Sequence, residues 1–124
     1  MSGIKFLLDT NFILGMLKST PEVVDVLSSK SLRSDQCAYS VITRMELLGF
    51  PGMTSAEEQL IRSTLERFQH LGISAEVEEA VIHLRRARRI KLPDALIAAT
   101  ALSHDLELLT LDAGLQATYG AIRH

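Results

Sequence analysis

Short apolar runs and helix-like segments alternate along this chain of 124 residues. The first run, at 4–8 (IKFLL), ends abruptly at the polar residues 9–11, as a buried strand does when it leaves a sheet. Runs at 36–39 and 106–111 predict two further strands. Short strands separated by helices pair in parallel, because parallel neighbours need a crossover connection. The pattern therefore predicts a three-layer α/β/α fold with a short central parallel sheet.

Helix-start signals predict the helices of the first half. One helix begins near Asn11. Thr20 is followed by a proline and an acid, which predicts a helix over about 21–29 with the Thr20 hydroxyl as its cap. Ser40 is the cap of a third helix, which ends at Leu48 before a glycine.

The second half carries equally clear signals. Capping-box spacing at 55–58 and apolar residues at helical intervals predict one long helix that runs to Gly72. Ser74 caps the next helix, whose first turn is acidic and whose last turns are basic, as the helix dipole favours. Pro93 opens the last predicted helix, which has no charged residue from 95 to 103 and is therefore expected to be buried on several sides.

Composition places the chain among globular proteins, with 47% apolar and 23% charged residues, and excludes a disordered tail or a fibre. No repeat, low-complexity tract or linker marks a boundary, so we expect residues 1–124 to form a single domain. The longest uncharged stretch is about half a membrane span, so we expect no membrane segment. Cys37 is the only cysteine and can form no internal disulfide, which fits a cytoplasmic protein.

The net charge of −2 excludes a protein that holds nucleic acid by bulk charge alone. A local basic cluster nevertheless precedes the last predicted helix. One interpretation, which stays open, is that these basic residues compensate the dipole of the helix before them. Alternatively, Arg85, Arg86 and Arg89 share an outward helical face and bind the backbone of an RNA substrate. The cluster consists of Arg85, Arg86, Arg88, Arg89 and Lys91.

Four acids lie beside buried segments. Asp9 directly follows the first strand and Asp112 the last, while Asp94 lies in the first turn of the uncharged helix and Glu46 interrupts an apolar run. Each acid alone fits an ordinary helix start, a turn or a solvated position. Ligands of open α/β sheets, however, bind outside the carboxyl ends of the strands, where these acids converge.

Converging carboxylates repel one another unless a cation or a shared proton compensates them. With the amide of Asn11 and the hydroxyls of Thr10 and Thr110, the four acids form an all-oxygen ligand set that suits Mg²⁺ or Mn²⁺ and not zinc. Such sites activate water for phosphoryl transfer. The chain has no HxxxH, GxSxG or glycine-rich phosphate loop, which argues against zinc hydrolases, serine hydrolases and P-loop proteins. Receiver domains and haloacid-dehalogenase-like phosphatases need a second carboxylate near Asp9, and position 11 is asparagine.

Four blocks of the sequence resemble the PIN domain family, and in particular its VapC-type toxins. The blocks are LLDTNFIL at 7–14, SVITRMELLGF at 40–50, LPDALIAATAL at 92–102 and LLTLD at 108–112. The resemblance implies a metal-dependent endoribonuclease. In such an enzyme Asp9, Glu46, Asp94 and Asp112 would coordinate Mg²⁺ or Mn²⁺ and activate water, supported by Asn11, Ser40 and Thr110.

The same resemblance implies particular partners. VapC-type toxins are homodimers that act on RNA and pair with a small antitoxin. The antitoxin blocks the acidic pocket with its C-terminal segment, often through a basic side chain, and binds DNA with its other half, so this chain would reach DNA only indirectly. A catalytically silent module of the same fold, which only binds RNA or a basic peptide, is the alternative. Metal dependence of RNA cleavage distinguishes the two.

Overall fold

The computed structural model describes residues 3–123, which contain one four-stranded parallel sheet in the order β3-β2-β1-β4. Strand β1 is central, because Phe6 pairs with Cys37 on one side and with Glu107 on the other. Strand β3 extends the sheet beyond β2. The strands are β1 (Phe6–Leu8), β2 (Cys37–Ser40), β3 (Gln69–Leu71) and β4 (Glu107–Leu109).

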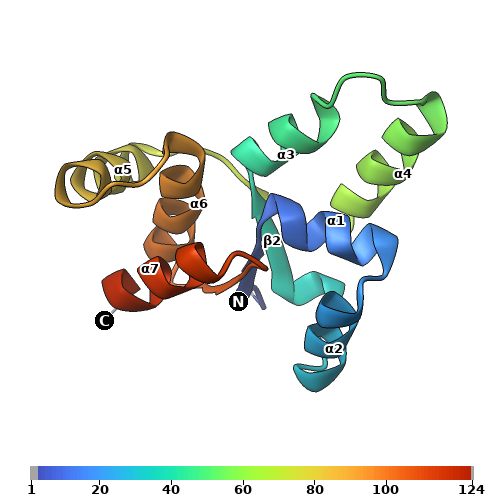
Figure 1. Ribbon diagram of the computed structural model, residues 1–124, viewed down its shortest axis with the longest axis horizontal. Helices are drawn as coiled ribbons and strands as arrows, with labels where there is room; N and C mark the ends of the chain where they lie inside the picture. Colours follow the sequence, from blue (N-terminus) through green and yellow to red (C-terminus); the bar gives the residue numbers. More distant parts are fainter. Residues whose placement is uncertain (1–2, 124) are drawn as a thin grey trace.

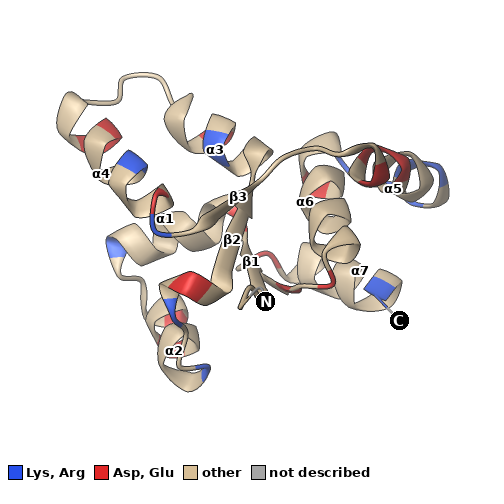
Figure 2. Cartoon of the chain, turned by 180° about the vertical axis from the view of Figure 1, so that it is seen from behind, with Lys and Arg blue, Asp and Glu red and all other residues tan. Residues whose placement is uncertain are grey.

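Helices cover both faces of this sheet (Figure 1). Helices α1, α2 and α4 lie on one side and α5, α6 and α7 on the other, and the view from behind in Figure 2 agrees. The predicted three-layer α/β/α fold is confirmed. No helix within residues 3–123 is long and apolar enough to cross a membrane. The α-helices of these residues are α1 (Thr10–Lys18), α2 (Pro21–Ser29), α3 (Val41–Leu48), α4 (Ser55–Leu65), α5 (Ala75–Ala87), α6 (Leu92–Ser103) and α7 (Ala113–Arg123).

The core has two halves, one on each face of the sheet. Alternating side chains of β1 divide between them: Leu7 packs with α5, α6 and α7, whereas Leu8 packs with Phe12 of α1 and Leu65 of α4. Both leucines are fully buried, and each such burial contributes about 2 kcal/mol to folding. Helix α6 is buried on several sides, as its lack of charge predicts. The sheet is thereby held rigidly between two apolar layers.

The predicted long helix to Gly72 is wrong at its end. Helix α4 ends at Leu65, and a turn leads into β3, which pairs with β2. The helical spacing continued to Phe68 because Phe68 is buried in the same core half as α4, although it follows the turn. Strand β3 itself buries only Leu71 of its three residues, so it leaves almost no apolar signature.

Helix α7 lies where no element was predicted. It packs Leu115 and Tyr119, one turn apart, against the α6 side of the sheet. The Tyr119 hydroxyl donates a 2.6 Å hydrogen bond to the carbonyl oxygen of Leu106, just before β4. This contact fastens the last helix to the strand that precedes the site.

Thr20 does not cap α2 through its side chain, contrary to the prediction. The hydroxyl is buried and is the one buried side-chain polar atom without a hydrogen-bond partner in residues 3–123. It lies against Gly15, where an added Cβ would come within 2.9 Å of it and 2.5 Å of Val23 Cγ2. Close packing of α1 on α2 therefore takes the hydroxyl away from the helix end. Pro21 still favours a helix start at this point, because its fixed φ suits the first helical position and its missing N–H leaves no donor unpaired there.

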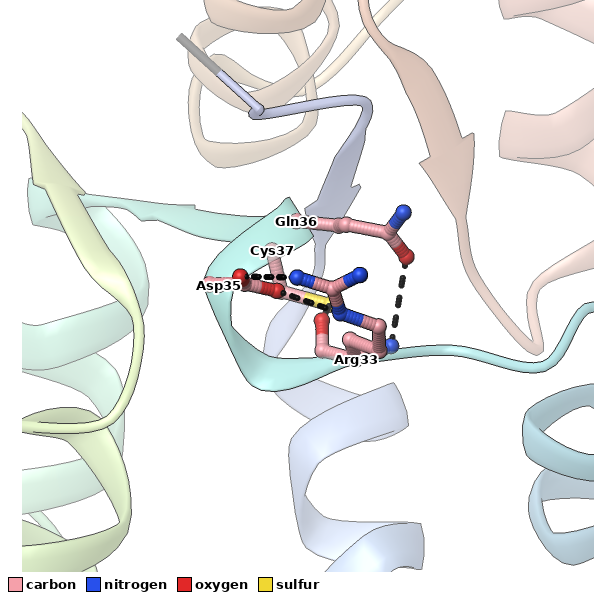
Figure 3. A network of polar contacts seen from close by, with 4 residues as sticks. All are labelled: Arg33, Asp35, Gln36 and Cys37. Atoms are coloured by element: carbon pink, nitrogen blue, oxygen red, sulfur yellow. Dashed lines mark hydrogen bonds and ion pairs between the residues drawn. The ribbon is translucent and has the colours of Figure 1, made fainter.

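A short 3₁₀ turn, Ser34–Gln36, leads into β2 (Figure 3). Arg33 pairs with Asp35 across the turn, and its backbone N–H donates to the Gln36 side chain. The Cys37 thiol donates to the Arg33 carbonyl oxygen, and burial raises the pKa of this thiol to about 11. Cys37 is therefore a protonated packing residue and not a nucleophile.

Candidate active site

Asp9 leaves the end of β1 and caps helix α1. Its Oδ1 accepts a 2.8 Å hydrogen bond from the backbone N–H of Phe12, and its Oδ2 accepts one from the Thr110 hydroxyl. The side chain is 4% exposed. Burial raises the pKa of Asp9, against the lowering effect of these two hydrogen bonds, and the charges of Asp112 and Asp94 raise it further.

Thr110 links the ends of two neighbouring strands. It donates to Asp9 after β1 and accepts a 3.0 Å hydrogen bond from the backbone N–H of Asp112 after β4. Asp112 Oδ1 in turn accepts from the Leu115 N–H at the start of α7. The two aspartates thus lie on either side of one hydroxyl at the carboxyl edge of the sheet, where β1 and β4 meet.

Glu46 reaches the same edge from helix α3. Its Oε1 accepts a 2.6 Å hydrogen bond from the hydroxyl of Thr10, the residue next to Asp9. The Thr10 oxygen also lies 3.2 Å from the hydroxyl oxygen of Thr43, which is fully buried. Glu46 is exposed, so this contact is what ties its carboxylate to the first strand end.

Asp94 comes from the first turn of α6 and is half-buried. Burial raises its pKa, as do the charges of Asp112 and Glu46, while Lys91 lowers it. Asp112 therefore acts electrostatically on both Asp9 and Asp94, and Glu46 acts on Asp94. All four acids belong to segments that meet at the carboxyl edge of the sheet.

The carboxylates are near one another but are not gathered around a single point. Within residues 3–123, no three acidic, histidine or cysteine side chains are arranged to hold one metal ion. Their donor chemistry still fits Mg²⁺ or Mn²⁺, because all the candidate ligands are hard oxygens. Burial is the main cause of the raised pKa values of Asp9 and Asp94, and the charges of the neighbouring acids add to it. A bound cation would offset both effects.

A cavity of about 520 Å³ opens beside these acids, between α1, α3, α4 and α6. Asp9, Asn11, Glu46 and Asp94 line it, whereas Asp112 is outside its lining. The rest of its lining is mostly apolar, through Leu14, Leu47, Phe50, Pro51, Met53, Ile61 and Ile97, with Lys18 and Glu57 as further charged residues. The cavity therefore combines acidic and apolar walls.

The two other candidate supports have different places. Asn11 is exposed and lines the cavity next to Asp9. Ser40 is 1% exposed, and its hydroxyl accepts a 3.2 Å hydrogen bond from the Ile42 N–H, so it caps α3 as predicted. Ser40 thereby orients the helix that carries Glu46.

The basic cluster is arranged differently from the prediction. Helix α5 ends at Ala87, and Arg88 has extended backbone, so Arg89 does not share a helical face with Arg85 and Arg86. Beyond the end of the helix, Ile90 packs against the core. All four arginines are exposed, and none lines the cavity.

Lys18 is a cavity residue that the sequence did not single out. It lies in the last turn of α1, lines the cavity and is exposed. A basic residue at a helix end is the ordinary dipole-compensating choice, so no signal marked it. Phe50, which is 71% exposed in the loop after α3, also lines the cavity, and the sequence did not single it out.

Comparison with known proteins agrees with this architecture. The model of the PIN domain family matches residues 6–121. The chain belongs to the PIN domain family. The resemblance of its four sequence blocks to PIN domains is thereby confirmed, and the carboxyl edge of this PIN domain carries the acids that those blocks contain.

Solved structures resemble this PIN domain along most of its length. A chain from a toxin–antitoxin complex of Klebsiella pneumoniae is 35% identical, with 87% of each chain covered and a TM-score of 0.74. A chain of FitAcB from Neisseria gonorrhoeae is 28% identical, with 93% of each chain covered and a TM-score of 0.75. VapBC-5 from Mycobacterium tuberculosis, at 24% identity, shares the fold, with 96% of this chain and 93% of that chain covered and a TM-score of 0.63. No curated protein sequence matches the chain.

Proposed function

We propose that this PIN domain is a Mg²⁺- or Mn²⁺-dependent endoribonuclease that acts as the toxin of a toxin–antitoxin pair. The observation that carries the proposal is that Asp9, Glu46, Asp94 and Asp112 lie at the carboxyl edge of the sheet, the first three of them in the lining of an open cavity. Burying the Asp9 carboxylate near other carboxylates costs folding free energy, and such costly charges cluster at functional sites.

In this proposal the four acids would hold the metal, which supplies a water of lowered pKa and neutralises charge on the phosphate. The chain's own groups fix where that happens. Thr110 and the Phe12 N–H hold Asp9, and Ser40 orients the helix of Glu46. Asn11, which lines the cavity, would donate a hydrogen bond to an RNA oxygen.

The partner that fits the cavity best is an antitoxin segment with apolar side chains and one basic side chain. The apolar residues of the lining, with Phe50 largely exposed, would bind the apolar side chains, and the acids would bind the cation. The Klebsiella pneumoniae relative, from a toxin–antitoxin complex, supports such a partner. We also propose a homodimer, with DNA reached only through the antitoxin and the protein acting in the cytoplasm.

A paired expression experiment tests this function. Wild type and Asp9→Asn are induced in a bacterial host without antitoxin, and growth and RNA integrity are followed together. We expect wild type to stop growth and produce discrete RNA fragments, whereas D9N does neither. Asp25→Asn, an exposed acid on α2 outside the cavity, is the matched control and behaves as wild type. Equal effects of wild type and D9N would favour the RNA- or peptide-binding module instead.

A further inference from the structure

A buried hydroxyl lies one helical turn before Glu46 and does not form a hydrogen bond within its own helix. Thr43 of α3 is fully buried, and within residues 3–123 its hydroxyl has a single hydrogen-bond partner, the Thr10 hydroxyl at 3.2 Å. Buried hydroxyls on helices usually donate to a carbonyl oxygen of their own helix. Thr100 of α6, equally buried, does so, at 2.7 Å from the Leu96 oxygen. Thr43 instead points across to another helix.

The direction of this hydrogen-bond chain follows from the chemistry of its end. An ionised carboxylate can only accept, so the Thr10 proton goes to Glu46 Oε1, 2.6 Å away. A hydroxyl has only one proton, so the Thr10 oxygen must accept from Thr43. The chain therefore runs from Thr43 through Thr10 to Glu46, and each bond polarises the next.

The hydrogen bond from Thr10 is the only one that Glu46 receives in the described part of the protein. Glu46 is exposed, and a free glutamate side chain in water samples many rotamers. Thr10 is adjacent to Asp9, so the chain fixes the Glu46 carboxylate relative to the most buried acid of the site. The second oxygen of Glu46 is left available for a ligand.

We propose that Thr10 and Thr43 are positioning residues that hold Glu46 in one conformation at the acidic site. The inference rests on the proposed function, since it concerns the same acids. It adds two residues that the acidic motifs themselves do not include. Thr43 acts from inside the core and touches neither substrate nor metal.

The first test needs neither metal nor RNA. Side-chain ¹³C relaxation and three-bond couplings of Glu46 are measured in metal-free protein for wild type, Thr10→Val, Thr43→Val and Thr43→Ser. We expect a single Glu46 rotamer in wild type, rotamer averaging in T10V, partial averaging in T43V and recovery in T43S. Thr100→Val is the control, because it removes an equally buried hydroxyl that contacts no acid, and it leaves Glu46 unchanged.

The second test measures Mn²⁺ affinity by calorimetry for the same variants. Loss of a residue that orients a ligand weakens metal binding roughly tenfold or more, and we expect this for T10V. T43V loses one hydrogen bond further away, which corresponds to roughly three- to tenfold. T43S restores the affinity, and T100V does not change it. A merely structural Thr43 would lower the melting temperature of metal-free T43V and leave Mn²⁺ affinity as in wild type.

The two proposals fail in different ways. Averaged Glu46 rotamers in wild type, or rotamers that neither T10V nor T43V changes, would overturn the positioning role. Wild type that neither binds Mn²⁺ nor cleaves RNA, but in which T10V still frees Glu46, would overturn the proposed function and support the positioning role. If T10V does not fold, the pair T43V and T43S decides the outcome alone.

Discussion

Asp94 shows how a single carboxylate can cost stability while it serves a site. Burial and the charges of Asp112 and Glu46 raise its pKa, so its ionised form is disfavoured in the folded protein. We expect Asp94→Asn to abolish RNA cleavage and to raise the melting temperature of metal-free protein by on the order of a few degrees. Calorimetry in EDTA, with D25N as the control, measures the second effect.

The raised pKa values also fix how stability depends on pH. Folded Asp9 and Asp94 keep their protons to higher pH than the unfolded chain, whose aspartates titrate near 3.8. Metal-free protein therefore gains stability as pH falls through the raised pKa values towards 3.8, and loses it as pH rises. We expect this dependence to be weaker in D94N. If protonation of these acids does not raise the melting temperature as pH falls through that window, the electrostatic explanation is contradicted.

At this scale the sequence predicted where the four acids lie in the fold, and the contacts around them only partly. Asp9 and Asp112 follow strands directly, and Asp94 begins an uncharged helix, so their neighbours reveal them. Thr43 carries no such signal, because a threonine inside a helix is common and its partner is 33 residues away. Lys18 joins the cavity through the packing of α1 near α4, which only three-dimensional structure shows.

Helices α1 and α2 meet so closely that a glycine is required between them. An added Cβ at Gly15 would lie 2.5 Å from Val23 Cγ2, a stiff side chain that is fully buried. We expect Gly15→Ala to destabilise the protein by about 1–2 kcal/mol, because overpacking outweighs the better helix propensity of alanine. Gly120→Ala in α7 is the matched control: its Cβ meets nothing within 4 Å, so it stabilises by about 0.5–1 kcal/mol. Denaturant unfolding measures both, and a stabilised G15A would contradict the packing.

Elements with clear ends were predictable and those without were not. Helix α2 matches its predicted bounds, and α6 was recognised by its lack of charge. Strand β3 was missed because it has three residues and buries one. Helix α7 was missed because only two of its residues, Leu115 and Tyr119, are buried, although they lie one turn apart. Short or half-exposed elements are defined by their neighbours in the fold, and a local pattern does not contain those neighbours.

The whole molecule has few means of holding RNA other than through phosphates. Only 5% of its residues are aromatic and it has no tryptophan, so base stacking is limited. We expect RNA affinity, measured with cleavage-deficient D94N, to fall steeply with salt. The double variant Arg85→Ala/Arg86→Ala should bind more weakly and flatten the salt dependence by roughly 0.7 in log–log slope per lost phosphate contact.

Arg62→Ala is the matched control for that measurement. Arg62 is an exposed arginine on α4 that pairs with Glu58 and lies outside the basic cluster. It should leave the salt slope unchanged. If R62A and the double variant behave alike, the basic cluster serves the dipole of α5 and not RNA.

We propose that the acids at the carboxyl edge of the sheet make this PIN domain a metal-dependent ribonuclease. The most direct measurement incubates purified wild type, D9N and D25N with total bacterial RNA, first in EDTA and then after addition of Mn²⁺. The account predicts no cleavage in EDTA, discrete fragments with Mn²⁺ for wild type and D25N, and none for D9N. Cleavage that persists in EDTA, or that D9N retains, would contradict it.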